Sequence, residues 1–256
     1  FFADTYICNA DPQAMSYVIG REKFPKKYLP ALSFDYAPSG VMMYLGLKDI
    51  DLRDYGFGNF NIWHLTQWDM NQMWKEQMAE DFRKPWFFLS TPTLHSTEEG
   101  VAPPGHQILE VATLTSYEMF KSRKDKDPSL YRKKKREIAE RLLDLVEEYH
   151  VPDIRKHINL RVVGTPTTNE DFARAPMGNA YGSLLTPEQI GLKRLKADTP
   201  WSNFFWCNAS SGFAGFHGTT GTGAALYMRL TGDYFFKTEN MPTDEEFISR
   251  LPKKLE

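Results

Sequence analysis

Residues 203–230 read NFFWCNASSGFAGFHGTTGTGAALYMRL, and the interpretation of the whole chain starts from this stretch. Its opening run, residues 204–207, has the length and aromatic content of a buried strand. Good helix formers occupy residues 224–230, ahead of Gly232. Between strand and helix we expect a turn of small residues, with glycines at positions 212, 215, 218, 221 and 223.

Such an arrangement can bring backbone N–H groups close to an electron-rich ligand. Glycine has no Cβ to block the approach, and a helix N-terminus carries unpaired donors and a partial positive charge. Glycine-rich turns also occur as tight structural corners, and the phosphate-loop pattern of glycine, four residues and Gly-Lys-Ser/Thr is absent. Cofactor contact and a structural corner therefore both stay open on local grounds.

Composition is that of a globular protein with one large or two modest domains. The chain has 256 residues, of which 41% are hydrophobic and 25% charged. A net charge of −2, without a basic face, gives no reason to expect a nucleic-acid partner. No apolar run approaches the length of a membrane span, and no signal peptide is evident. The chain opens on Phe1 inside what reads as structure, so we expect a piece of a longer protein.

Cysteine and histidine usage argues against a metal centre. Cys8 and Cys207 are the only cysteines, and none of the six histidines has metal-ligand spacing. We therefore expect no disulfide scaffold and a reducing, intracellular compartment. His217 stands out because it lies within the glycine-rich stretch; a hydrogen-bonding turn residue is its simplest interpretation.

The order of expected strands and helices, without strict alternation, predicts an α/β fold (mixed α+β). The clearest helix is 128–149, preceded by Asp127 as cap and begun by Pro128. Residues 41–47 are apolar throughout, so we expect a strand covered on both faces. The remaining expected strands are 6–8, 59–65, 86–90, 107–115 and 158–163, and the remaining helices are 13–19, 69–82 and 165–172.

Several short segments occur in an order known from one group of flavoproteins. They are Asn9-Ala-Asp-Pro12, Tyr44-Leu-Gly-Leu47, Ala102-Pro-Pro-Gly-His106, Thr165-Pro166, Gly178-Asn-Ala-Tyr-Gly182 and Asn208-Ala-Ser210. Over residues 3–232 this order and spacing resemble the carotenoid desaturase superfamily, which includes phytoene desaturases, carotenoid cis-trans isomerases and all-trans-retinol saturases. Asn61-Ile-Trp63 and Trp68-Asp-Met-Asn71 are most similar to the isomerase and retinol-saturase branch.

The resemblance implies a partial flavoprotein fold, with an incomplete dinucleotide-binding domain and a mixed-sheet substrate domain. Residues 1–29 and 186–232 would belong to the FAD-binding domain, 30–185 to the substrate domain and 233–256 to a tail. The implied cofactor is FAD. The residues expected to contact it are Asn208, Ala209, Ser210, Gly215, Phe216, Gly218, Gly221 and Thr222.

The implied activity is that of an FAD-dependent oxidoreductase or isomerase acting on carbon–carbon double bonds of a carotenoid, retinoid or similar apolar lipid. The flavin would carry out the chemistry, so no catalytic acid or base is predicted. An apolar polyene partner fits a protein peripheral to a plastid or other internal membrane. Residues 41–65 and 86–115 would form a sheet facing the flavin with an elongated apolar pocket, whose wall includes Met43, Trp63 and Phe88. Core packing is the competing interpretation for these aromatic residues.

Two features depart from the family pattern. The dinucleotide fingerprint Gly-x-Gly-x-x-Gly is absent, since the segment Gly56-Phe-Gly58-Asn-Phe-Asn61 lacks the third glycine. Ser211-Gly212-Phe213 stands where the family has His-Pro-Gly. We therefore expect these residues alone to hold FAD weakly or not at all, with an amino-terminal half or a partner chain supplying the rest. The alternative is a catalytically inactive flavoprotein remnant acting as a structural subunit of a larger assembly.

Overall fold

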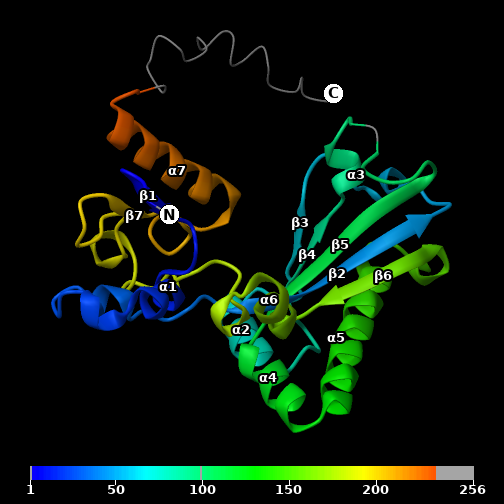
Figure 1. Cartoon of the computed structure of the whole chain (residues 1–256). Coiled ribbons are helices and arrows are strands. Elements are labelled where there is room, and N and C mark those ends of the chain that lie inside the picture. Colours follow the sequence, from blue (N-terminus) through cyan, green and yellow to red (C-terminus); the bar gives the residue numbers. More distant parts are fainter. Residues whose placement is uncertain (1, 99, 235–256) are drawn as a thin grey trace. The chain divides into compact units, whose positions relative to one another are not determined.

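A computed structural model of the chain describes residues 2–98 and 100–234, which form two compact units (Figure 1). The end unit combines Phe1–Leu32 with Gly191–Glu256, and the middle unit is Ser33–Ile190. These borders lie a few residues beyond those expected from sequence. The assignment of one unit to cofactor and the other to substrate stays a prediction. The expected tail, 233–256, lies outside the described residues after Tyr234.

The middle unit is built on a five-stranded sheet with the order β3-β4-β5-β2-β6. Every described pairing in it is antiparallel, whereas a mixed sheet was expected. Hydropathy patterns locate strands but do not give their direction, which accounts for the difference. The strands are β2 (Ser39–Lys48), β3 (Ile62–His64), β4 (Phe87–Ser90), β5 (His106–Thr115) and β6 (Ile158–Gly164).

Helices cover one face of this sheet. Helix α5 (Pro128–Tyr149) has the predicted bounds, and the Asp127 side chain accepts a hydrogen bond from the Ser129 N–H at 2.7 Å. Helix α4 (Tyr117–Lys126) precedes it, and both contribute to the core against the sheet (Figure 1). The core residues from the two helices are Met119, Phe120, Ile138, Ala139, Leu142, Leu143, Leu145 and Val146.

The central strand β2 differs from expectation in one respect. Val41, Met43, Leu45 and Leu47 are fully buried against the helices, but the alternate side chains are not, and Tyr44 is 42% exposed. The prediction that this strand is covered on both faces within its unit is therefore wrong. An antiparallel sheet can pack one face and leave the other open. The side chains of β2 on the uncovered face are also apolar, so the sequence showed no alternation of polar and apolar residues.

The smaller helices of the middle unit are α2 (Met70–Met78), α3 (Pro92–His95) and α6 (Pro166–Ala173). Helix α2 ends earlier than expected because Glu80 adopts a left-handed conformation with φ 67°. Helix α4 was missed because its sequence is polar and only Met119 and Phe120 are buried. No helix in 2–98 or 100–234 combines the length and apolar content needed to cross a membrane.

Two histidines join the end of β3 to the end of α5. His64 Nδ1 lies 3.0 Å from His150 Nε2, and the His64 ring stacks on Phe87 at 4.6 Å between ring centroids. Burial lowers the pKa of His150 to about 4, and the neighbouring His64 adds to the effect. Burial also lowers the pKa of His64. The fold therefore favours the neutral form of both rings.

Acidification should weaken this contact. The pKa of His150 in the folded state lies below that of an unfolded histidine, so its contribution is complete above about pH 6.5 and disappears towards pH 4. Allowing for solvent screening, we expect a loss of about 1–2 kcal/mol. Urea unfolding at pH 7 and pH 4.5 measures it. His150→Gln should lose less stability on acidification than the wild type; equal losses would contradict the assignment.

The end unit contains a short parallel strand pair. Strand β1 (Tyr6–Cys8) pairs with β7 (Phe204–Trp206), and α1 (Pro12–Ile19) follows the Asp-Pro turn predicted from sequence. The Asp11 side chain caps α1 by accepting a hydrogen bond from the Ala14 N–H at 2.9 Å. Trp206 is fully buried, and its Nε1 donates to the Tyr28 hydroxyl at 3.0 Å.

The last helix, α7 (Gly215–Thr231), begins well before the predicted position. Gly218, Gly221 and Gly223 therefore lie inside the helix rather than in a turn. Threonine hydroxyls bind carbonyl groups one turn earlier, as from Thr219 to Gly215 at 2.8 Å. The helix ends at Gly232 with φ 72°, as predicted.

Candidate functional site

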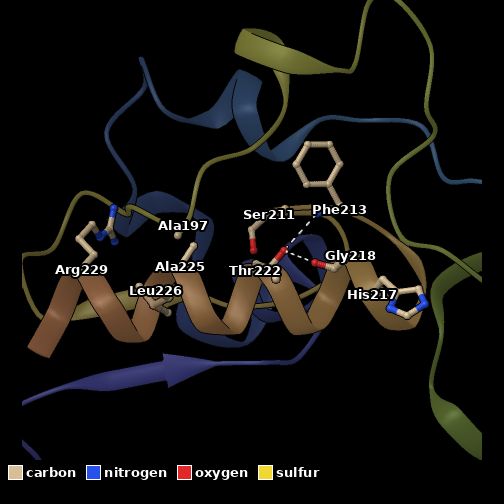
Figure 2. A pocket seen from close by; sticks show the side chains of 11 residues that line it. Ala197, Ser211, Phe213, His217, Gly218, Thr222, Ala225, Leu226 and Arg229 are labelled. Atoms are coloured by element: carbon tan, nitrogen blue, oxygen red, sulfur yellow. Dashed lines mark hydrogen bonds between the residues drawn. The ribbon is translucent and has the colours of Figure 1, made fainter. Parts of the chain in front are cut away.

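A cavity of about 470 Å³ runs along α7 in the end unit (Figure 2). The helix forms its floor, and the loop after β7 forms one wall. Three of its lining residues are glycines, at which the backbone has no side chain to cover it. The lining residues are Ala197, Ser211, Gly212, Phe213, His217, Gly218, Gly221, Thr222, Ala225, Leu226 and Arg229.

Thr222 joins the loop to the helix. Its hydroxyl accepts a hydrogen bond from the Phe213 N–H at 3.2 Å and donates to the Gly218 carbonyl at 2.8 Å (Figure 2). A Cβ at Gly212 would lie 2.0 Å from the Thr222 hydroxyl oxygen, and one at Gly218 would lie 2.8 Å from the Phe213 carbonyl carbon. Close approach of loop and helix thus requires glycine at both positions.

Asn208 shapes the start of the loop. Its side-chain oxygen accepts hydrogen bonds from the N–H groups of Ser210 at 3.0 Å and Ser211 at 3.1 Å. Its side-chain nitrogen donates to the Ala10 carbonyl at 3.0 Å, which ties the loop to the segment after β1. Both polar atoms of the Asn208 side chain are therefore used in hydrogen bonds that hold the loop in place.

Arg194 was not identified from sequence, although it supports the loop from behind. Its side chain is 6% exposed and donates to the carbonyl groups of Gly212 and Ala209. Among the described residues, its Nη1 has no hydrogen-bond partner and no carboxylate forms an ion pair with it. Burial lowers the pKa of this guanidinium. The basic run Lys193-Arg194-Leu195-Lys196 resembles an ordinary solvated segment, so the sequence carried no clear signal.

The residues predicted to contact a cofactor divide into two groups. Gly218, Gly221 and Thr222 line the cavity together with His217. The others frame it: Asn208, Ala209 and Ser210 belong to the loop, Gly215 begins α7, and the Phe216 side chain is 80% exposed.

The predicted substrate wall lies in the middle unit and divides between two faces of the sheet. Trp63 and Phe88 share the face opposite the helices, with ring centroids 5.1 Å apart, and Trp86 stacks on Trp63 at 5.3 Å. Trp63 is 64% exposed, so core packing does not explain it. Met43 is fully buried on the helix-covered face. It therefore does not share a wall with the other two.

We call the face opposite the helices the open face. Its centre holds one carboxyl group, that of Glu110, which pairs across the strands with Ser90 on one side and Tyr44 on the other. Burial raises the pKa of Glu110, and the charge of His95 partly opposes this. The open face comprises Met42, Tyr44, Gly46, Trp63, Phe88, Ser90, Ile108, Glu110, Ala112, Leu160 and Val162.

The part of the chain that the structure describes contains no group of three or more histidine, cysteine, aspartate or glutamate side chains able to hold a metal ion. The residues predicted to contact a cofactor lie in or around the cavity along α7, and Trp63 and Phe88 lie on the open face.

No protein-family model matches the chain. Among curated proteins, it is 27% identical over 223 residues to a chloroplastic prolycopene isomerase of Arabidopsis thaliana, covering 84% of this chain and 34% of that protein. It is 30% identical over 128 residues to the chloroplastic prolycopene isomerase of Daucus carota, covering 50% and 20%. It is also 28% identical over 171 residues to all-trans-retinol 13,14-reductase of Danio rerio, covering 58% and 27%.

The aligned segments span about a third or less of the length of these relatives, from 20% to 34%. The relatives are nonetheless of the kind expected from the short motifs. The chain is thus a homologue of prolycopene isomerases and an all-trans-retinol 13,14-reductase, which confirms, at modest identity over part of its length, the resemblance to the carotenoid isomerase, desaturase and saturase group.

Proposed function

We propose that the protein is an FAD-dependent enzyme acting on carbon–carbon double bonds of a carotenoid, retinoid or similar apolar lipid, and that the cavity along α7 takes part of the flavin. The names of its homologues support the reaction class. The glycine-lined cavity, with buried Arg194 behind its loop, is the observation that carries the assignment of this chain's residues.

The cavity fits an aromatic, electron-rich group. Along its floor, a Cβ built on Gly221 meets nothing within 4 Å, so the backbone there is open to a flat ring. Gly218, Gly221 and Thr222 would hold the ring. The unpaired nitrogen of Arg194 adds positive charge near the loop, which favours an anionic form of a bound group.

A bound flavin would supply the electron-transfer chemistry. The chain's own residues would bind and orient it. The loop over α7 fixes one wall of the cavity through Thr222, and Leu226 and Ala225 keep part of the lining apolar.

Phe213 was the reason for considering a catalytically inactive remnant, because a bulky ring replaces the family's glycine. Figure 2 shows its ring directed away from α7, and the side chain is 70% exposed. Phe213 is one of the lining residues, but its ring does not point across the cavity towards the helix, which favours the enzyme over the structural subunit.

Two matched substitutions in α7 test the cavity in the natural full-length protein. Gly221→Leu places a side chain in the cavity, whereas Gly223→Leu places the same side chain at a helical glycine that does not line it; neither added Cβ meets an atom within 4 Å. Each should stabilise the helix by about 0.5–1 kcal/mol. We expect the flavin-to-protein ratio, measured by absorbance after gel filtration, to fall at least tenfold only for Gly221→Leu.

Equal flavin content in the two variants would show that the cavity does not take the flavin. A full-length protein that is purified without flavin and does not bind added FAD would favour the remnant.

A further inference from the structure

The open face of the middle-unit sheet is mostly apolar but carries one carboxyl group, that of Glu110. Glu110 lies at its centre, with Trp63 and Phe88 towards one edge and Val162 and Leu160 towards the other. An apolar ligand laid across all five strands would extend over about 19 Å and would pass over this carboxyl group.

The carboxyl group of Glu110 forms no hydrogen bond or ion pair in the described part of the chain, although the charge of His95 acts on it. Its cross-strand neighbours both bear hydroxyl groups: Ser90 is buried, whereas Tyr44 is 42% exposed. The carboxyl group is partly removed from water, which raises its pKa; burial, and secondly the negative charge of Glu110, raises the pKa of Tyr44. Covering it with a pure hydrocarbon would remove water from a polar group and offer nothing in exchange.

We propose that Glu110 is a specificity-determining residue of the open face, selecting an apolar polyene that carries one hydroxyl group over a matched ligand without a hydrogen-bond donor. This rests on the proposed function for the class of ligand. A hydroxyl group donates a hydrogen bond to the carboxylate, while Trp63 and Phe88 contact the conjugated chain.

The selectivity follows from the cost of leaving a polar group unpaired. A site built to bind a substrate hydroxyl discriminates strongly against the analogue that lacks it, because its own polar group is then desolvated without a partner. Glu110 is only partly covered, so we expect a preference of about tenfold to a hundredfold rather than the larger ratios of closed sites.

All-trans-retinol and retinyl methyl ether form a suitable probe pair, since a methyl group replaces the hydroxyl hydrogen and the ether has no hydrogen-bond donor. Binding is measured by quenching of tryptophan fluorescence in flavin-free protein, with Trp63 and Trp86 on or beside the open face. The wild type should bind the alcohol at least tenfold more tightly. Glu110→Leu should remove this preference while binding the ether at least as tightly as the wild type does. Glu110→Gln, which keeps a hydrogen-bond acceptor, should retain part of the preference.

Glu118→Leu is the matched control, because Glu118 is an exposed residue of α4 rather than of the open face. It should leave both affinities unchanged. The proposal is overturned if the wild type does not distinguish the two ligands, if it binds neither, or if the preference survives in Glu110→Leu. This binding measurement needs no flavin. A failure of the proposed flavin site would appear as an absence of FAD binding, and the two outcomes can therefore be told apart.

Discussion

Gly218→Val is expected to lower the free energy of unfolding by about 2–3 kcal/mol, the range of overpacking in a closely packed region. A Cβ at this position would lie 2.8 Å from both the carbonyl carbon and the Cβ of Phe213. Backbone cannot yield as a flexible side chain does, so the loop would have to separate from α7 and break the hydrogen bond from the Phe213 N–H to Thr222.

Gly221→Val is the control for this effect, since it adds the same branched side chain to the same helix where nothing lies within 4 Å. Urea unfolding of both variants at one pH separates the clash from the change in helix propensity. A Gly218→Val protein as stable as Gly221→Val would show that the loop does not pack on α7 as described. Both variants should lose flavin if the cavity takes it.

Substitution of Arg194 should also lower the free energy of unfolding strongly. Comparing the stabilities of two variants, Arg194→Lys and Arg194→Met, is the most informative test. Arg194→Lys keeps a buried positive charge but replaces a fork that reaches two carbonyl groups with a single ammonium group. Arg194→Met removes the charge together with its need for a partner. We expect a loss of about 3 kcal/mol for the lysine variant and a smaller loss for methionine.

Thermal or denaturant unfolding of the two variants checks this order. If the methionine variant were less stable than the lysine variant, the positive charge itself would be stabilising. The wild-type guanidinium would then have an anionic partner that the lysine side chain also reaches. Repeating the measurement with added FAD would then identify whether the cofactor supplies that partner.

Local signals in the sequence were sufficient for much of the fold. Asp127 and Pro128 mark the start of α5, and its apolar spacing carries it to Tyr149, so both bounds were predicted. Strands β1 and β7 were short apolar runs next to turn residues and were located correctly, although their parallel pairing required the structure.

The features that could not be predicted from sequence depend on tertiary contacts. Glycine and threonine are poor helix formers, so the start of α7 at Gly215 could not be read from propensity. It depends on Thr222 bonding both to Gly218 and to the loop. Arg194 lay unnoticed in a basic run. Glu110 was the single carboxyl in the predicted strand 107–115, and that mismatch was the available signal.

Strand β1 pairs with a strand that is synthesised almost two hundred residues later, because Tyr6 lies opposite Phe204. During translation, residues 33–190 leave the ribosome before β7 and can fold as the middle unit while β1 is not yet paired with β7. An incomplete chain released before residue 204 would therefore contain a β1 edge without β7, a recognised starting point for association between chains. Messenger features that slow translation just before β7 would prolong that state.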